Sequence, residues 1–267
     1  MAPRVLERAA RTALVTLATA KSHLGISGAT EDALVGVLLE HVRGLFEGEL
    51  GRPLVRQRYA ETLPTSSRRR MVLSVCPVDA HNVTATLAGE PVDGIVAIEP
   101  AGGVLYLEAG WGGGAGGPED AAPDLEITYH AGWLSPDAVQ TWAAGLTLAA
   151  GDWLRPSSPA LCPWLLEVTT GGATGAGPEP VWPSTAGDTV AVGAAVATAR
   201  DAVEVPAGVQ ALALYTLGLL YNARKREPGM VSLSADGFSA TWAPGAVLAG
   251  GLPEEVRAAL RPWRWEG

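Results

Sequence analysis

The histidines and cysteines are the side chains of this sequence best suited to bind a metal ion or attack a substrate. No histidine follows another at the short spacing of paired metal ligands, and the four are His23, His41, His81 and His130. The two cysteines, Cys76 and Cys162, form no Cys-x-x-Cys motif. They predict neither a zinc site nor a disulfide framework, and we expect two small buried hydrophobic side chains. No cofactor or metal is expected.

Motifs for catalysis or nucleotide binding do not stand out either. The sequence has no Gly-x-Ser-x-Gly nucleophile motif, and its carboxylates are scattered. The glycine-rich segment 110–117 (GWGGGAGG) lacks the Gly-Lys-Ser/Thr ending of a phosphate loop and is followed by Pro118. We expect a flexible hairpin tip there. The sequence therefore predicts a protein that is not an enzyme, with an unrecognised hydrolase as the weakest alternative.

The charge balance limits the possible contacts with nucleic acid. The chain of 267 residues has a formal net charge of −9 and a pI near 5.0. Because backbone binding to DNA is driven mostly by Lys and Arg, this balance argues against wrapping nucleic acid, while a wall past which DNA slides is still allowed. Arg68, Arg69 and Arg70 form the one basic run singled out. It is interpreted either as a solvated turn or as a contact to DNA or an acidic partner.

Helical patterns dominate the first fifty residues. Thr16 is a good N-cap for a helix over residues 17–24, which Gly25 ends. A long amphipathic helix follows over 30–50, and its predicted apolar face consists of Leu34, Val37, Leu38, Val42, Leu45 and Phe46. Gly51 suits a left-handed C-terminal cap, and Pro53 prevents the helix from resuming.

A β-rich section follows these helices. Short segments rich in β-forming residues and bounded by Pro, Gly, Ser or Asp predict strands over 55–63, 71–76, 82–87, 94–99, 104–109 and 125–130. We expect a small antiparallel meander. A strongly apolar helix is predicted from Val205 and Pro206 onward, and we expect it to pack against the helix over 30–50. The overall fold class is thus α+β. The apolar run 209–223 is too short to span a membrane, so no membrane partner is expected.

Three segments resemble the head-tail connector (adaptor) proteins of long-tailed phages. Residues 14–54 contain an opening L-V-T-L-x-x-A-K helix, a Gly/Ser/Asp-rich turn, a second helix and a closing G-R-P-L. Residues 127–133 (ITYHAGW) are similar to the V-T-Y-x-A-G-aromatic strand of these connectors, and Asn222-Ala223-Arg224 loosely matches the end of their third helix. The resemblance implies a virion neck protein that forms a ring of twelve copies. It further implies a portal protein above the ring, a stopper or tail-completion protein below it, and DNA that passes through without sequence-specific binding.

The resemblance is interrupted between residues 134 and 204. We therefore expect three parts, namely a connector core in two pieces, 1–133 and 205–267, and an inserted small all-β domain at 134–204. The insert resembles a β module of phage tail and fibre proteins, and somewhat resembles small carbohydrate-binding modules. Its tryptophans either build a core or form a glycan-stacking platform, and they are Trp142, Trp153, Trp164 and Trp182. The alternative function is therefore a carbohydrate-binding virion protein that acts through this insert.

The C-terminal residues are a candidate docking element. A hairpin is predicted over 231–243, and Pro253 opens a final helix with acidic residues in its first turn. Pro262 is expected to stop that helix, so that the tryptophans project toward the portal or an adjacent ring subunit and the arginines meet its carboxylates. The docking residues are Leu260, Arg261, Trp263, Arg264 and Trp265. The alternative is that both indole rings fold back on the protein's own core.

Overall fold

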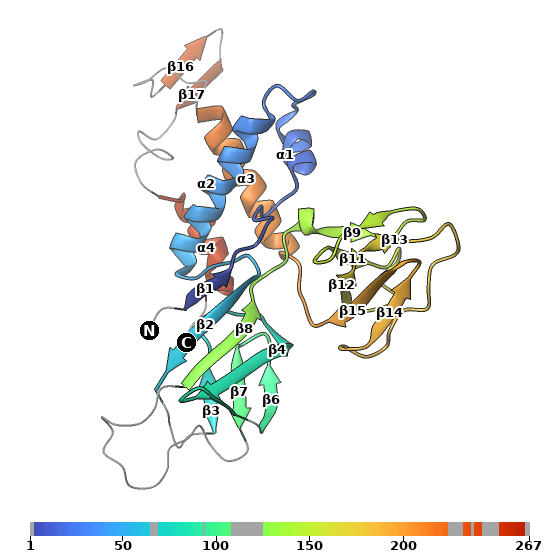
Figure 1. Cartoon of the computed structure of the whole chain (residues 1–267). Helices are drawn as coiled ribbons and strands as arrows, with labels where there is room; N and C mark the ends of the chain where they lie inside the picture. The colour runs from blue at the N-terminus through green and yellow to red at the C-terminus, as the bar shows by residue number, and fades with distance from the viewer. Residues whose placement is uncertain are drawn as a thin grey trace. The chain divides into compact units, whose positions relative to one another are not determined.

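The computed structural model in Figure 1 describes residues 3–64, 69–92, 94–107, 125–223, 232–235, 238–241 and 251–264. The chain forms two compact units. A helical unit comprises Thr12–Leu54 and Val205–Glu266, and a β unit comprises Met1–Arg11, Val55–Glu204 and Gly267. The α+β fold class is confirmed. The glycine-rich segment 110–117, Arg68, Arg224 and Trp265 lie outside the described residues.

The first helix of the helical unit begins and ends where its caps predict. Helix α1 spans Leu17–Leu24, and the Thr16 side chain accepts a hydrogen bond from the Thr19 N–H at 3.0 Å. Gly25 ends the helix in the left-handed conformation, with φ at 67°. Lys21, in the last turn, forms an ion pair with Asp32. Both predicted caps are confirmed.

Helix α2 spans Asp32–Leu50 and also ends at the predicted glycine, because Gly51 has φ at 68°. Its predicted apolar face was partly wrong. The buried residues are Val35, Leu39, Val42, Phe46 and Leu50, whereas Val37 is 68% exposed. Apolar residues occur at spacings of three and four on two neighbouring faces of this helix, so the pattern does not decide which face is buried. Packing against the other helices of the unit determines the buried face.

The remaining helices complete this unit. Helix α3 spans Ala207–Ala223 and contacts α1, α2 and α4 (Glu254–Leu260), which confirms the predicted packing of the long helix against the third one. A 3-10 turn, η3 (Arg261–Trp263), follows α4. Strands β16 (Ser232–Ala235) and β17 (Phe238–Thr241) pair as the predicted antiparallel hairpin. Within the described residues, no helix is long and apolar enough to cross a membrane.

The β unit contains two sheets that share one core, and they do not form the predicted meander. The five-stranded sheet has the order β1-β2-β8-β4-β5, and the three-stranded sheet has the order β3-β7-β6. The strands of the first sheet are β1 (Arg4–Glu7), β2 (Gln57–Leu63), β8 (Leu125–Ala131), β4 (Val78–Leu87) and β5 (Glu90–Pro91). Those of the second are β3 (Arg70–Val72), β7 (Val104–Leu107) and β6 (Ile95–Glu99). The meander fails because β2 pairs with β8 instead of with β3, the next strand along the chain.

The shared core is apolar apart from one satisfied acidic group. It contains Tyr59, Leu73, Leu105 and Ile127, among others. Glu61 is only 2% exposed, but it accepts hydrogen bonds from the Tyr129 hydroxyl at 2.8 Å and from the Ser74 N–H at 3.1 Å. These bonds offset the cost of removing the carboxylate from water.

Residues 134–204 build a separate sheet with its own core. Its order is β14-β15-β12-β11-β9, and a two-stranded sheet, β10-β13, accompanies it. These strands are β9 (Val139–Thr141), β10 (Thr147–Leu148), β11 (Trp153–Arg155), β12 (Leu165–Thr170), β13 (Gly172–Ala173), β14 (Thr189–Val192) and β15 (Ala195–Arg200), after a 3-10 turn, η2 (Pro136–Ala138). The Leu134 N–H donates to the Val203 carbonyl at 2.8 Å. The two ends of this segment, called the β module below, therefore lie side by side.

Gly132, directly before the β module, lies where only glycine fits. Its φ is +103°, and a Cβ there would lie 2.7 Å from the carbonyl carbon and oxygen of Val55. This close approach allows Val55 to bridge Trp133 and allows the Arg56 N–H to donate to the Trp133 carbonyl at 2.7 Å. Gly132 of the 127–133 segment thus has a steric role.

We predict that Gly132→Ala lowers the free energy of unfolding of the β unit by roughly 3 kcal/mol or more, because the backbone of Val55 cannot move aside cheaply. Gly44→Ala is the control, since its Cβ would meet nothing within 4 Å in the middle of α2. That substitution should raise stability by about 0.5–1 kcal/mol. Urea unfolding followed by circular dichroism measures both. Equal, small effects for the two variants would contradict the steric role of Gly132.

Candidate docking surfaces

A buried arginine connects the five-stranded sheet to the β module. Arg56 Nη2 lies 2.7 Å from Asp79 Oδ2, and the two side chains are 7% and 0% exposed. The guanidinium carbon of Arg56 also lies 5.0 Å from the centre of the Trp153 ring, a cation–π distance. Arg56, the residue directly before β2, therefore contacts residues of both β4 and β11.

Asp79 is well prepared to hold this charge. Besides Arg56, it accepts hydrogen bonds from the Asn82 side chain at 2.6 Å and from the His81 N–H at 3.1 Å. Burial alone acts to raise the pKa of Asp79, but the positive charge of Arg56 and these hydrogen bonds outweigh it. The net result is a pKa below the ordinary value, so the carboxylate is ionised at neutral pH.

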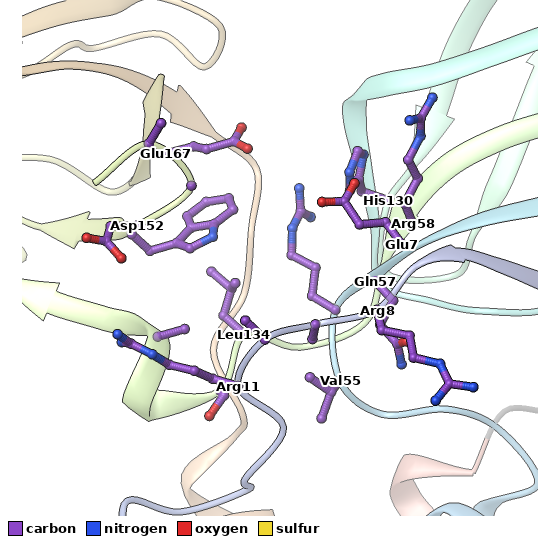
Figure 2. Close-up of a pocket in the computed structure, with 18 residues that line it drawn as sticks. Glu7, Arg8, Arg11, Val55, Gln57, Arg58, His130, Leu134, Asp152 and Glu167 are labelled. Atoms are coloured by element: carbon purple, nitrogen blue, oxygen red, sulfur yellow. The ribbon is translucent and has the colours of Figure 1, made fainter. Parts of the chain in front are cut away.

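Beside this arginine lies a cleft of about 380 Å³ within the β unit (Figure 2). Its sheet-side wall carries Glu7, Arg58 and His130, and its module-side wall carries Asp152 and Glu167. Residues 8–11 complete the lining. Burial, followed by the charge of Arg56, lowers the pKa of His130, so this imidazole is neutral near pH 7.

The four tryptophans of the β module are divided between two clusters. Trp182 is 8% exposed and belongs to the core of the module, with Trp142 and Trp164 packed against that core half-buried. Trp153 is 7% exposed and packs with Leu134 and Val139 in a different cluster. These positions place the indole rings in packing roles, and they do not bring all four together on one surface.

The arginine run is only partly described. Arg69 and Arg70 are exposed, and Arg70 is the first residue of β3. Because Arg68 lies outside the described residues, the run cannot be placed as a unit. A role in contacting DNA or an acidic partner stays a prediction.

The C-terminal docking residues have different environments. Leu260 is fully buried, so it belongs to the core of the helical unit and not to an exposed surface. Pro262 lies inside η3 and does not start an extended segment, and Trp263 is half-buried close to Gly208 of α3. Arg52 of the G-R-P-L motif donates to the Trp263 carbonyl at 3.0 Å. Arg261 and Arg264 are exposed.

A second pocket, of about 210 Å³, lies along α4 and η3. Three arginines line it together with Glu49 and Glu254, and they are Arg257 of α4, Arg261 of η3 and Arg264 directly after η3. Arg257 Nε lies 3.5 Å from Glu49, and Arg261 lies 3.4 Å from Glu254. Arg257 Nε is buried and makes no hydrogen bond among the described residues. The pocket thus presents donors to an acidic group.

The sequence did not point to Arg56 or Arg257, and it gave Arg52 no contact beyond its place in the G-R-P-L motif. Each is an isolated arginine next to a turn or inside a short helix, a pattern typical of a solvated surface. Both cysteines are buried and free, as expected of small hydrophobic residues. Within the described part of the chain, no three His, Cys, Asp or Glu side chains gather as metal ligands.

Comparisons with known proteins give distant structural similarity. No protein-family model and no curated protein matches this sequence. A chain from the neck of a native gene transfer agent particle, computed with C12 symmetry, is 16% identical, with 99% of this chain and 95% of that chain covered and a TM-score of 0.44. A chain from the neck of an empty particle, computed with C6 symmetry, is 19% identical, and one from the native virion is 23% identical. Both cover 51% of this chain and 73% of the other, with TM-scores of 0.39 and 0.35.

We predict that Asp79→Asn destabilises the β unit by about 3 kcal/mol at pH 7, because it leaves the buried Arg56 charge uncompensated. The pKa of Asp79 is lower in the folded than in the unfolded chain. The stabilisation by the ionised Asp79 is therefore complete above the unfolded-state pKa of about 3.9, and it is lost as the pH falls through the folded-state pKa. The difference between the two proteins should therefore shrink below about pH 4.

Chemical unfolding at a series of pH values measures this difference. Glu126→Gln is the control, since its pair with Arg4 is 3.6 Å long and exposed, and it should change stability by less than about 0.5 kcal/mol. A gap between wild type and Asp79→Asn that is constant from pH 7 to pH 2.5 would count against the ion pair.

Proposed function

We propose that this protein is a structural head-tail connector subunit in the neck of a tailed phage or phage-derived particle. It would form a ring of twelve copies between the portal and a stopper or tail-completion protein, with DNA passing through the centre. The protein acts as an assembly element and not as an enzyme. The proposal rests on the sequence signature of residues 14–54 and 127–133, and on the roles that these residues take in the fold.

One observation carries the proposal furthest. The signature residues lie at the positions that define the fold, because Thr16 and Gly25 cap α1, Gly51 caps α2, and Gly132 permits the approach of Val55. Arg52 of the same signature holds the C-terminal turn through the Trp263 carbonyl. A chance match to a motif would not be expected to place its residues at caps and contacts throughout.

We propose the face formed by Arg257, Arg261 and Arg264 as the docking surface of the helical unit. A portal carboxylate that enters this pocket could receive two donors from one guanidinium, and Arg261 and Arg264 are the exposed ones. Leu260 and Trp263 then have a supporting role, since they fix α4 and η3 against the other helices. Neighbouring subunits of the ring are expected to meet through the β unit, with at least ~1,200 Å² buried for each interface.

The first test is the assembly state. We expect native mass measurement to show rings when the purified protein is mixed with portal rings of its own particle, whether or not it is monomeric alone. The double variant Arg261→Glu/Arg264→Glu should weaken portal binding at least tenfold, about 1.4 kcal/mol, without lowering thermal stability, because both side chains are exposed.

Arg4→Glu, at an exposed position in the β unit, is the matched charge control and should bind as wild type does. If the double variant binds portal rings as tightly as wild type does, this face is not the docking surface, but the connector role is not contradicted. A wild-type protein that never binds portal rings would remove the connector role itself.

We further propose that the β module, residues 134–204, is a removable insertion in the connector core. Leu134 and Glu204 form a bridge, so the chain enters and leaves the module at one place. The module also has its own core around Leu154, Leu166 and Val168. A segment with adjacent ends and its own core is the kind of insertion that a surface loop tolerates.

Replacing residues 135–203 by a short Gly/Ser linker should leave the helical unit and the two core sheets folded. Some stability of the β unit should be lost, because Arg56 loses the cover of the Trp153 ring. Circular dichroism and protection of amide hydrogens in β2, β4 and β8 measure the outcome. Complete loss of protection in these strands would show that the module is part of the core.

A further inference from the structure

Helix α3 has no charged side chain, although 18% of the chain is Asp, Glu, Lys or Arg. One side of the helix is nevertheless open to solvent, and the exposed residues there follow one another at every fourth position. They are Ala207, Ala211 and Tyr215, called the α3 face below. The Tyr215 hydroxyl donates to Glu255 at 3.3 Å, so an apolar partner could cover the ring without isolating a polar group. Exposed sides of helices ordinarily carry charges, and an uncharged one indicates a surface that a partner covers.

Helix α2 has an open face of the same kind. Ala33, Val37 and His41 also follow at every fourth position and are exposed, and they are called the α2 face below. Val37 is 68% exposed and lies two residues beyond the buried Val35, which is about 200° around the helix axis. One turn further on, a Cβ at Gly44 would meet none of the described residues within 4 Å. The side of α2 away from the core is therefore apolar, open and free of bulky side chains at its end.

The two faces look away from each other within one subunit. Helices α2 and α3 pack together and run antiparallel (Figure 1). Near the end of α3 the Tyr221 hydroxyl donates to Glu31, directly before α2, at 2.6 Å. The start of α3, at Gly208, lies close to Trp263, whose carbonyl is held by Arg52 just after α2. Because both open faces are on the far sides of the packed pair, a contact between the α2 face of one copy and the α3 face of another is heterologous and repeats from copy to copy.

We propose that the α2 face of each copy binds the α3 face of the next copy, with the two helices antiparallel. Both faces advance by about 6 Å for every four residues, so their side chains meet in register. The opposed pairs are Ala33 with Tyr215, Val37 with Ala211, and His41 with Ala207. Each larger side chain thus meets an alanine, which allows the helix axes to approach to about 8–10 Å.

A second copy is the partner that these observations favour. Neither face carries a charge, so the contact buries no uncompensated ion, and the small and large residues of one face complement those of the other. The direction of the helices rests on the proposed ring. Neighbours in a ring of twelve are related by a rotation of about 30°, so α3 of the next copy stays close to antiparallel to α2.

The area of the contact determines what it can do alone. A strip three turns long and about 10 Å wide covers roughly 150 Å² of each copy. A stable interface covers about 800 Å² of each partner. The helical contact therefore adds to the interface that we expect through the β unit, and it is too small to hold two free copies together.

The test captures the contact as a disulfide bond. Val37→Cys and Ala211→Cys are combined in the whole protein, whose own cysteines, Cys76 and Cys162, are buried. The protein is oxidised with copper phenanthroline, with and without the portal rings of its particle, and is separated on non-reducing gels. We expect a ladder of cross-linked oligomers that lengthens when portal rings are present, because every copy offers one cysteine to each of its two neighbours.

The single variants and a shifted pair provide the controls. Val37→Cys protein mixed with Ala211→Cys protein should give dimers and no longer species, and neither should cross-link alone. Gly48→Cys combined with Ala211→Cys is about three turns out of register and should give at least tenfold less product. Equal product from this pair, or dimers from Val37→Cys alone at the yield of the mixture, would overturn the proposal.

The same gels separate this contact from the proposed function. No ladder in either condition overturns the contact, and if wild type still forms rings on the portal, the connector role is kept. A ladder from a protein that never binds portal rings keeps the contact and removes the connector role.

A charge placed on the α2 face gives an independent measure. Val37→Glu should weaken ring formation on the portal at least tenfold, because its carboxylate would be buried against Ala211 without a partner. Val181→Glu is the matched control, since Val181 is 93% exposed in the β module and belongs to neither face. It should assemble within twofold of wild type, and both variants should unfold in urea as wild type does. Assembly of Val37→Glu at the level of wild type would contradict the contact.

Discussion

The buried guanidinium of Arg56 is the interaction on which the geometry of the β unit depends. Removing a charge from water costs several kcal/mol, and the ion pair with Asp79 offsets that cost only if the remaining hydrogen-bonding groups are satisfied. Here Asn82 and the His81 N–H satisfy the carboxylate, while Trp153 covers the guanidinium. A buried pair of this kind contributes little net stability compared with apolar residues. It does impose one arrangement, because any shift of β11 away from β2 would uncover the charge.

The steric constraint at Gly132 acts on the same junction. Without a Cβ at this residue, the chain before β2 can approach the end of β8, which brings the Arg56 N–H to the Trp133 carbonyl. The backbone contact therefore fixes the position of the Arg56 main chain, and the ion pair with Asp79 fixes the position of its guanidinium group. The β module departs immediately after this point, at Leu134, and returns at Glu204. Two local constraints thus determine how a segment of about seventy residues is attached.

Sequence reasoning succeeded where structure is decided locally. Thr16, Gly25 and Gly51 set helix ends through their own backbone and side-chain preferences, so α1 and the end of α2 were predicted to the residue. It failed where distant segments decide. The pairing of β2 with β8 was missed because short strands carry no signal for their partners, and β1 was missed because all four of its side chains are exposed and show no alternation.

The candidate sites follow the same division. The C-terminal arginines were recognised because Trp and Arg near a terminus are unusual, but the burial of Leu260 depends on its packing in the helical unit and has no local signal. Arg56 and Asp79 are 23 residues apart, and the local sequence around either residue does not predict that the two pair. Their pairing becomes visible only when β2 and β4 are placed on the two sides of β8.

The distribution of arginine on an acidic chain bears on how partners are selected. At a net charge of −9, long-range electrostatics would repel acidic partners and further copies of the chain alike. Attraction of a partner at the proposed docking face, Arg257, Arg261 and Arg264, would therefore act only at short range, where the guanidinium donors meet a carboxylate. Salt would then have two opposing effects, since it weakens the repulsion at a distance and weakens the exposed pairs at contact. Association that relies on such a surface gains specificity from geometry and not from steering, which fits the proposed role of a subunit whose partners are held in place by a larger assembly.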